Sequence, residues 1–203
     1  MKKIILMVLI VSAISFKIKA QNTNLINAFN NSYALEKKGD FSDARKELQT
    51  VYNEKSYEIN LRMGWLLYNE GEMMNSVKFY EKAIALMPYA IEAKLGLVYP
   101  LSSLGNWEAV LETYLKILKT DPNNTLVNYR TGLIYYNRKE YAKANSYLQK
   151  NINLYPFNYE NLILSAWSYL NLGQQTEAKV LFEKCLLINA EDESAKAGLK
   201  LIK

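Results

Sequence analysis

The 203-residue sequence contains no histidine and only one cysteine, Cys185. Histidine is the most common general base and the most common metal ligand in proteins. Its absence excludes a Ser-His-Asp triad, a Cys-His pair and a histidine-containing zinc site built from this chain alone. A single cysteine excludes an intramolecular disulfide framework. The sequence also lacks a phosphate-binding loop, a dinucleotide fingerprint and a metal-ligand cluster, so we expect no enzymatic activity, no cofactor and no metal.

The first 20 residues have the pattern of a secretory signal peptide. Lys2 and Lys3 precede an apolar run at residues 4–16, and the small residue Ala20 follows soon afterwards. The run is well short of the roughly 20 residues that a membrane-spanning helix needs. We therefore expect residues 1–20 to be removed on export and no stable membrane span to remain. The alternative is an uncleaved anchor. In a bacterial source, the exported protein would be periplasmic or secreted.

Most of the excess positive charge lies in this same segment. The formal net charge is +5, but four of the 25 basic residues are Lys2, Lys3, Lys17 and Lys19. Their removal leaves 21 basic residues against 20 acidic ones. A nearly neutral chain lacks the electrostatic footprint of a nucleic-acid-binding protein, so we expect no nucleic-acid partner.

The rest of the chain carries an internal repeat. Pro88, Pro122 and Pro156 are evenly spaced, and Gly71 and Gly105 each lie half of this spacing before a proline. Each copy also contains a triplet whose members are mostly aromatic or apolar, then small, then aromatic or leucine. The triplets are Phe41-Ala44-Leu48, Met73-Ser76-Tyr80, Trp107-Val110-Tyr114, Tyr141-Ala144-Leu148 and Gln175-Ala178-Phe182.

This pattern resembles the tetratricopeptide repeat (TPR), a 34-residue helix–turn–helix unit whose length equals the proline spacing. The resemblance implies an all-α fold, a right-handed α-solenoid of about five TPR units with a C-terminal capping helix. We expect a repeat domain over residues 21–192 and a capping helix over residues 193–203. The expected copies lie near residues 25–56, 57–90, 91–124, 125–158 and 159–192.

Several residues depart from the repeat or fill special places in it. Lys139 stands where the other copies have a turn glycine, and Asn151 stands where they have a small apolar residue. Pro100 falls inside a predicted helix, one turn after Gly96, and we expect the pair to accommodate a bend there. Cys185 holds a small-residue position, so we expect a buried core thiol rather than a reactive one.

In this family the first helix of each copy lines a concave groove. The resemblance implies that the groove carries aromatic rings edged with asparagine amides and almost no charge, without the lysines and arginines that grip acidic chain ends. Rings provide large contact areas, and amides pair with peptide groups. Rings at helical spacing also pack between helices, and that interpretation stays open. The groove residues are Tyr33, Trp65, Tyr68, Asn69, Tyr99, Tyr129, Tyr136, Asn137, Trp167 and Asn171.

These features favour an exported interaction scaffold that binds an uncharged peptide or protein segment in its aromatic groove. Two other hypotheses remain. Aromatic platforms with flanking amides also suit a glycan-binding protein, and a structural subunit of a cell-envelope assembly could use its convex face instead. The sequence leaves the identity of the partner and the oligomeric state open.

Overall fold

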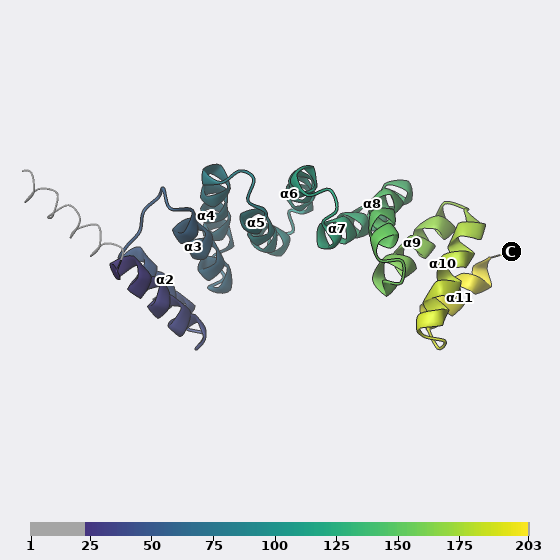
Figure 1. Cartoon of the computed structure of the whole chain (residues 1–203), viewed down its shortest axis with the longest axis horizontal. Coiled ribbons are helices and arrows are strands. Elements are labelled where there is room, and N and C mark those ends of the chain that lie inside the picture. The colour runs from purple at the N-terminus through teal and green to yellow at the C-terminus, as the bar shows by residue number, and fades with distance from the viewer. Residues whose placement is uncertain (1–22, 203) are drawn as a thin grey trace, which may run out of the picture. The chain divides into compact units, whose positions relative to one another are not determined.

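The computed structural model describes residues 23–202, and every regular element in that range is an α-helix. The all-α repeat fold predicted from the sequence is confirmed, whereas the predicted signal peptide lies outside the described residues. No helix within 23–202 is both long enough and apolar enough to cross a membrane. Residues 23–36 are helical and precede the labelled helices of Figure 1. Those helices are α2 (Phe41–Gln49), α3 (Tyr57–Asn69), α4 (Met73–Leu86), α5 (Ile91–Ser103), α6 (Trp107–Thr120), α7 (Thr125–Asn137), α8 (Tyr141–Leu154), α9 (Tyr159–Asn171), α10 (Gln175–Ile188) and α11 (Glu193–Leu201).

The chain forms two compact units, one ending at Asn106 and the other beginning at Trp107. The division falls between α5 and α6, which are the two helices of the third predicted copy. In the first unit α3 packs against α4, and α5 packs against both. In the second unit α6 to α11 pack in sequence order, and α11 also touches α9. Within each unit the helices therefore bury their apolar stripes against their neighbours in sequence, as stacked repeats require.

Tight turns with one left-handed residue join the helices of a pair. Gly71 has a φ of 85°, and its N–H donates to the carbonyl of Tyr68 at 3.1 Å. Glycine adopts this conformation without the clash that a Cβ atom introduces. Lys139 has a φ of 61° and makes the same bond to Tyr136 at 2.8 Å. The fourth copy thus keeps the turn geometry although it lacks the glycine.

The first helix of a pair begins at a capping side chain in most copies. The side-chain oxygen of the capping residue accepts the backbone N–H three residues later, which satisfies one of the unpaired donors at a helix start. The capping residues are Ser56, Asn124 and Asn158, and Asp192 caps the single C-terminal helix α11 in the same way. The second helix of a pair often ends before a proline. The helices α4, α6 and α8 each end two residues before one, because the residue preceding proline disfavours the helical conformation.

Each unit has its own apolar core. In the first unit the core consists of Ala44, Leu48, Ile59, Met63 and Leu66. In the second it consists of Ile152, Leu162, Ala166, Ala178, Leu181, Phe182, Cys185 and Ala195. Cys185 is fully buried, and this burial raises the pKa of its thiol to about 12. The residue is therefore packed as the repeat position predicts.

The ring of Tyr80 lies between α3 and α5, where it leaves no room for a side chain at Gly64 or Gly96. A Cβ atom at Gly64 would lie 2.9 Å from this ring, and one at Gly96 would lie 2.2 Å from it. The α5 helix nevertheless runs through Pro100 from Ile91 to Ser103. The missing side chain of Gly96 makes room for Tyr80, and the bend expected at Gly96 and Pro100 stays a prediction.

Candidate binding groove

A groove of about 860 Å³ lies on the first unit, bordered by residues 23–36, α3, α5 and the end of α4. Three of the predicted rings, Tyr33, Trp65 and Tyr99, line it. Trp65 and Tyr99 are one repeat apart in the sequence and occupy equivalent positions on α3 and α5. The repeat register therefore brings these rings together, as predicted.

Trp65, Tyr68 and Tyr99 form a three-ring cluster. The ring centroids of Trp65 and Tyr68 are 6.0 Å apart, those of Trp65 and Tyr99 are 6.2 Å apart, and those of Tyr68 and Tyr99 are 5.6 Å apart. Trp65 and Tyr68 lie one turn apart on α3, so their side chains project from the same face. Tyr99 keeps 51% of its surface exposed. Tyr99 thus presents aromatic surface at the groove, whereas Trp65 and Tyr68 are half-buried.

The ion pair between Arg62 and Glu36 contacts this cluster through Trp65. Arg62 is only 7% exposed, forms an ion pair with Glu36, and places its guanidinium carbon 3.8 Å from the centroid of Tyr33. The indole N–H of Trp65 donates to the carboxylate of Glu36 at 2.6 Å. Burial alone would raise the pKa of Glu36, but the hydrogen bonds from Arg62 and Trp65 outweigh burial and hold it below its usual value.

Two further charges line the groove at its rim. Glu58 and Glu92 are exposed and stand at equivalent positions near the starts of α3 and α5. Glu58 accepts a hydrogen bond from the hydroxyl of Ser56 at 2.9 Å, and Glu92 accepts one from the hydroxyl of Tyr57 at 3.4 Å. Within residues 23–202 neither carboxylate forms an ion pair.

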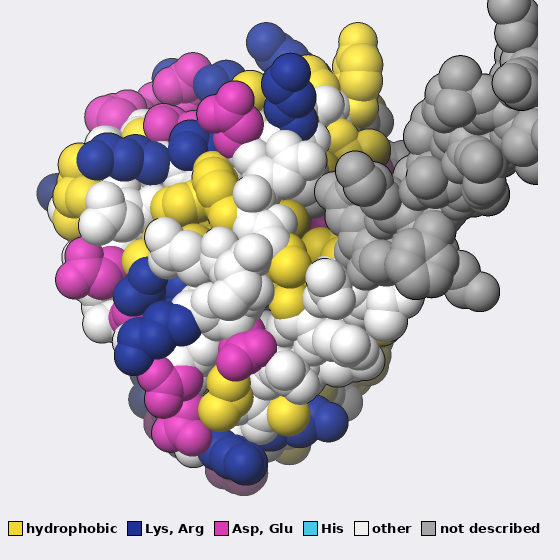
Figure 2. Space-filling model, turned by 90° about the vertical axis from the view of Figure 1, so that its left-hand side faces the viewer, with side chains coloured by type: hydrophobic (Ala, Val, Ile, Leu, Met, Phe, Trp, Pro, Cys, Tyr) yellow, Lys and Arg dark blue, Asp and Glu magenta, His cyan; other side chains and the backbone are white. Residues whose placement is uncertain are grey.

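The expectation of an almost uncharged groove is therefore wrong in the first unit. Arg62 was missed because it stands outside the helix positions assigned to the groove, and its partner Glu36 belongs to the preceding copy. Glu58 and Glu92 had a visible signal, since the same acidic residue recurs one repeat later at the start of a helix. On the face drawn in Figure 2, basic and acidic side chains are interspersed.

The predicted amides have different environments. The amide nitrogen of Asn69 donates to the carbonyl of Trp65 at 2.8 Å, and that of Asn171 donates to the carbonyl of Trp167 at 2.7 Å. Both bonds lie within a single helix and hold the amide against its own backbone. Asn137 is exposed near the end of α7. The binding role predicted for these amides stays a prediction.

In the second unit the predicted rings lie in three different surroundings. Tyr129 lines a cavity of about 510 Å³ together with Asn151 and Tyr155. Tyr136 packs against Tyr141, with centroids 5.4 Å apart.

Trp167 packs edge-on against the core residue Phe182, with centroids 5.2 Å apart. Its indole N–H donates to the hydroxyl of Ser194 on α11 at 2.9 Å. Trp167 therefore fastens the capping helix, and we interpret it as a packing residue rather than part of a shared recognition surface.

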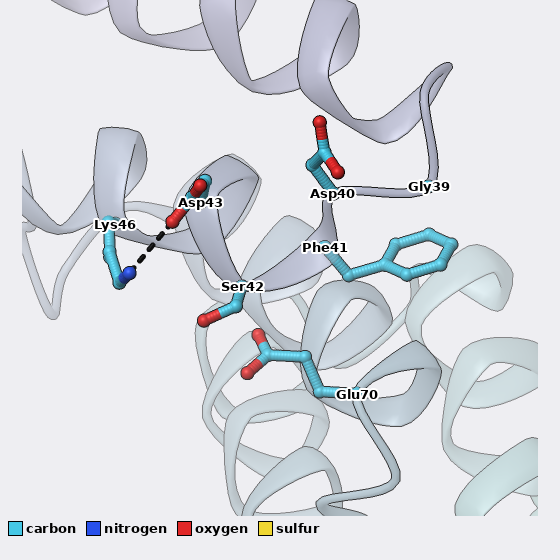
Figure 3. A pocket seen from close by; sticks show the side chains of 7 residues that line it. All are labelled: Gly39, Asp40, Phe41, Ser42, Asp43, Lys46 and Glu70. Atoms are coloured by element: carbon cyan, nitrogen blue, oxygen red, sulfur yellow. Dashed lines mark hydrogen bonds and ion pairs between the residues drawn. The ribbon is translucent and has the colours of Figure 1, made fainter.

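A second hollow in the first unit, shown in Figure 3, has charged walls, and three of its charged residues form ion pairs. It surrounds the turn from Gly39 to Asp43 and has a volume of about 470 Å³. Lys46 pairs with Asp43 at 2.7 Å within α2. Glu70 pairs with Arg45 of α2 at 2.7 Å, and this contact links α2 to the end of α3. No cluster of three or more potential metal ligands occurs in residues 23–202.

Family models for the tetratricopeptide repeat match three segments of the chain. One model matches residues 57–88 and 159–192, and a second model of the same description matches residues 127–158. These segments coincide with the helix pairs α3–α4, α9–α10 and α7–α8. The chain is a tetratricopeptide repeat protein. The family predicted from the glycine and proline spacing is thereby confirmed.

Solved structures of TPR proteins share this fold. A tetratricopeptide repeat protein from Parabacteroides merdae superposes with a TM-score of 0.74 at 19% identity, over 88% of this chain and 72% of that one. A MamA protein superposes with a TM-score of 0.71 at 20% identity, over 85% and 97% of the two chains. MamA from Desulfovibrio magneticus RS-1 gives 0.68 at 18% identity, over 84% and 97%. No curated protein matches the sequence significantly.

Proposed function

We propose that this TPR protein is an exported, non-enzymatic scaffold that holds a segment of a partner protein in the groove of the first unit. The main support is the cluster of Trp65, Tyr68 and Tyr99, in which Tyr99 is exposed and the other two rings are half-buried. Trp65 and Tyr99 line a groove of about 860 Å³. Repeat proteins of this type bind partners along the surface that their stacked helices form. Aromatic side chains in such a position are typical of the residues that contribute most binding energy.

The cluster is arranged before any partner binds. The indole of Trp65 is tied to Glu36, and Glu36 is tied to the buried Arg62. An ordered side chain loses little conformational entropy on binding, so a larger part of its contact energy contributes to affinity. We therefore expect Trp65 to be the main anchor, with Tyr99 as its neighbour on the next copy.

The export part of the proposal rests on the pattern of residues 1–20. Removal of that segment would make Gln21 the first residue of the mature protein. Amino-terminal sequencing of protein recovered from the native source tests this directly. A mature chain that begins at Met1 and sediments with membranes would instead support the uncleaved anchor.

The groove is tested by crosslinked capture from the native source with the double variant Trp65→Ala/Tyr99→Ala. We expect at least a tenfold loss of captured partner, since truncating two aromatic anchors removes several kcal/mol by typical measurements, roughly 2 or more each. The matched control is Tyr89→Ala, because Tyr89 belongs to the same unit but is 83% exposed on a loop outside the groove. Unchanged capture by a folded groove variant would contradict the proposal and favour binding through another face.

The second unit supports one alternative, a glycan site. The cavity beside Tyr129 combines a second ring, Tyr155, with the amides of Asn151, Asn158 and Asn161. Rings stack on sugar faces, and amides pair with hydroxyl groups as donors or acceptors. Calorimetry with envelope oligosaccharides, on the wild-type protein and on Tyr155→Ala, tests this candidate. A heat of binding that is lost in Tyr155→Ala would favour the glycan site. The absence of a heat of binding with the wild-type protein would contradict it.

A further inference from the structure

We propose that the first-unit groove selects its partner segment through a lysine or arginine side chain that binds Glu58 and Glu92, with an apolar residue of the same segment on Trp65 and Tyr99. The inference rests on the proposed function, because it specifies the chemistry of the occupant of the same groove. An acidic segment and a neutral segment are the competing occupants, and the test below separates them.

The charge balance of the groove favours a cationic occupant. Arg62 is the one basic residue among those that line the groove, and its charge is compensated by Glu36 and by the ring of Tyr33. Glu58 and Glu92 lack such compensation in the described chain. Each accepts a single hydroxyl hydrogen bond in the structure, although a carboxylate can accept about four hydrogen bonds. Free acceptor sites and net negative charge match the donors of an ammonium or guanidinium group.

Both carboxylates line the same groove, at the starts of α3 and α5. Each lies in the first turn of its helix, where the helix dipole stabilises negative charge. The hydroxyl of Tyr57, next to Glu58 on α3, reaches Glu92 on α5. This bond joins the starts of the two helices at the rim of the groove. The proposed basic side chain of the partner would lie at this end of the groove, beside both carboxylates.

The distance from the carboxylates to the rings sets the spacing of the recognised segment. Trp65 follows Glu58 by seven residues on α3, and Tyr99 follows Glu92 by seven on α5. Seven residues are nearly two turns, so acid and ring share a helix face about 10 Å apart along the axis. An extended chain covers about 10 Å in three residues. The preferred segment thus has a basic residue and an apolar or aromatic residue three positions apart.

The aromatic rings add to the same preference. Trp65 and Tyr99 both line the groove, and their rings meet at an interplanar angle of 72°. Ring faces attract cations and apolar groups alike and do not attract carboxylates. An arginine can lay its aliphatic stem on a ring while its guanidinium reaches a carboxylate. This geometry disfavours the acidic chain ends that a basic groove would hold.

The test is selection from a random dodecapeptide library on the purified full chain, in parallel with Glu58→Gln/Glu92→Gln. Both glutamates are exposed, so the variant should keep its thermal transition. On the wild-type protein we expect enrichment of peptides with lysine or arginine three residues from an apolar or aromatic residue. A selected peptide is then remade with citrulline for arginine, or norleucine for lysine. This neutral replacement should weaken binding about tenfold on the wild-type protein and less than twofold on the variant.

Two control proteins separate the inference from the proposed function. Glu54→Gln/Glu81→Gln removes two exposed acids of the same unit outside the groove and should retain the tenfold preference. Peptides that are selected without a basic residue, and that are lost with Trp65→Ala/Tyr99→Ala, would overturn the inference and leave the groove function standing. Binding equal to wild type on Trp65→Ala/Tyr99→Ala would contradict the groove function itself.

Discussion

At the scale of single residues, Lys139 shows that the turn geometry and the turn residue are separable. Its φ of 61° lies in the left-handed region, where the same turn in other copies has glycine. A side chain in this region costs about 1 kcal/mol, and the fold sustains it because the helices on either side determine the turn. The sequence position therefore predicts the backbone conformation even where the preferred residue is missing.

We expect Lys139→Gly to raise the free energy of unfolding by about 0.5 kcal/mol. Relief of the left-handed strain is larger than the entropy that glycine adds to the unfolded chain, but only slightly. Urea denaturation measures the difference. The reverse change, Gly71→Lys, is the matched control and should lower stability by a similar amount, because nothing lies within 4 Å of a Cβ atom there. Equal stability of both variants and the wild type would contradict the strain argument.

The Glu36–Arg62 pair should be worth far more than a surface pair. Glu36→Gln leaves the buried guanidinium of Arg62 without its counter-charge, and we expect a loss of about 3 kcal/mol in the free energy of unfolding. Asp43→Asn, which breaks the exposed pair with Lys46, should change it by less than about 0.5 kcal/mol. Equal losses in the two variants would contradict the burial argument.

The same pair predicts a pH dependence. The pKa of Glu36 is lower in the folded protein than its usual 4.5, so its ionised form stabilises the fold above pH 4.5. That contribution should disappear as the pH falls through the lowered pKa. The difference in unfolding free energy between the wild type and Glu36→Gln should accordingly shrink in acid, as measured by urea denaturation from pH 7 to pH 3. A difference that stays constant over this range would contradict the predicted contribution of ionised Glu36 to stability.

Cys185 should be inert in the folded protein. Burial and the nearby charge of Asp192 raise the pKa of its thiol to about 12, and the thiolate is the reactive species. Alkylation by iodoacetamide at pH 8, followed by mass spectrometry, should therefore modify Cys185 only in denaturant. Rapid modification of the native protein would show that this part of the core opens readily.

At the scale of helices, Tyr80 is the contact that sets how α3 and α5 approach. Its ring occupies the space left by Gly64 and Gly96. Gly96→Ala should therefore cost about 2 kcal/mol in unfolding free energy, because the added methyl group overlaps the ring. In a Tyr80→Leu background the same change should cost much less. A cost that is unchanged by Tyr80→Leu would show that Gly96 serves the bend at Pro100 after all.

Most of the helices could be predicted from the sequence, because the glycines and prolines mark where each helix ends. Contacts between copies could not. The contact of Gly96 with Tyr80 was not predicted, since Tyr80 belongs to another copy. A further series of contacts was not predicted either. Asn60, Lys94 and Asn128 stand one repeat apart, and each side chain donates a hydrogen bond to a carbonyl of the preceding loop. The recurrence was visible, but its meaning required coordinates.

At the scale of the whole molecule, equivalent positions in the repeat do not have equivalent roles. Trp65 and Trp167 hold the same place in their copies, yet Trp65 faces a groove whereas Trp167 packs on Phe182 and α11. The difference arises from the neighbours, since the copy after Trp167 is a single capping helix. The repeat register therefore predicted roughly where the aromatic residues lie. It could not predict which rings a neighbouring helix would cover.

The most direct test of the groove uses the three tryptophans of the chain, Trp65, Trp107 and Trp167. Each gives one indole N–H signal in an NMR spectrum of ¹⁵N-labelled protein, and the protein is titrated with a peptide that binds it. The account predicts that the Trp65 signal shifts with peptide concentration while the signals of Trp107 and Trp167 stay in place. A shift of Trp107 or Trp167 with Trp65 unchanged would contradict the account.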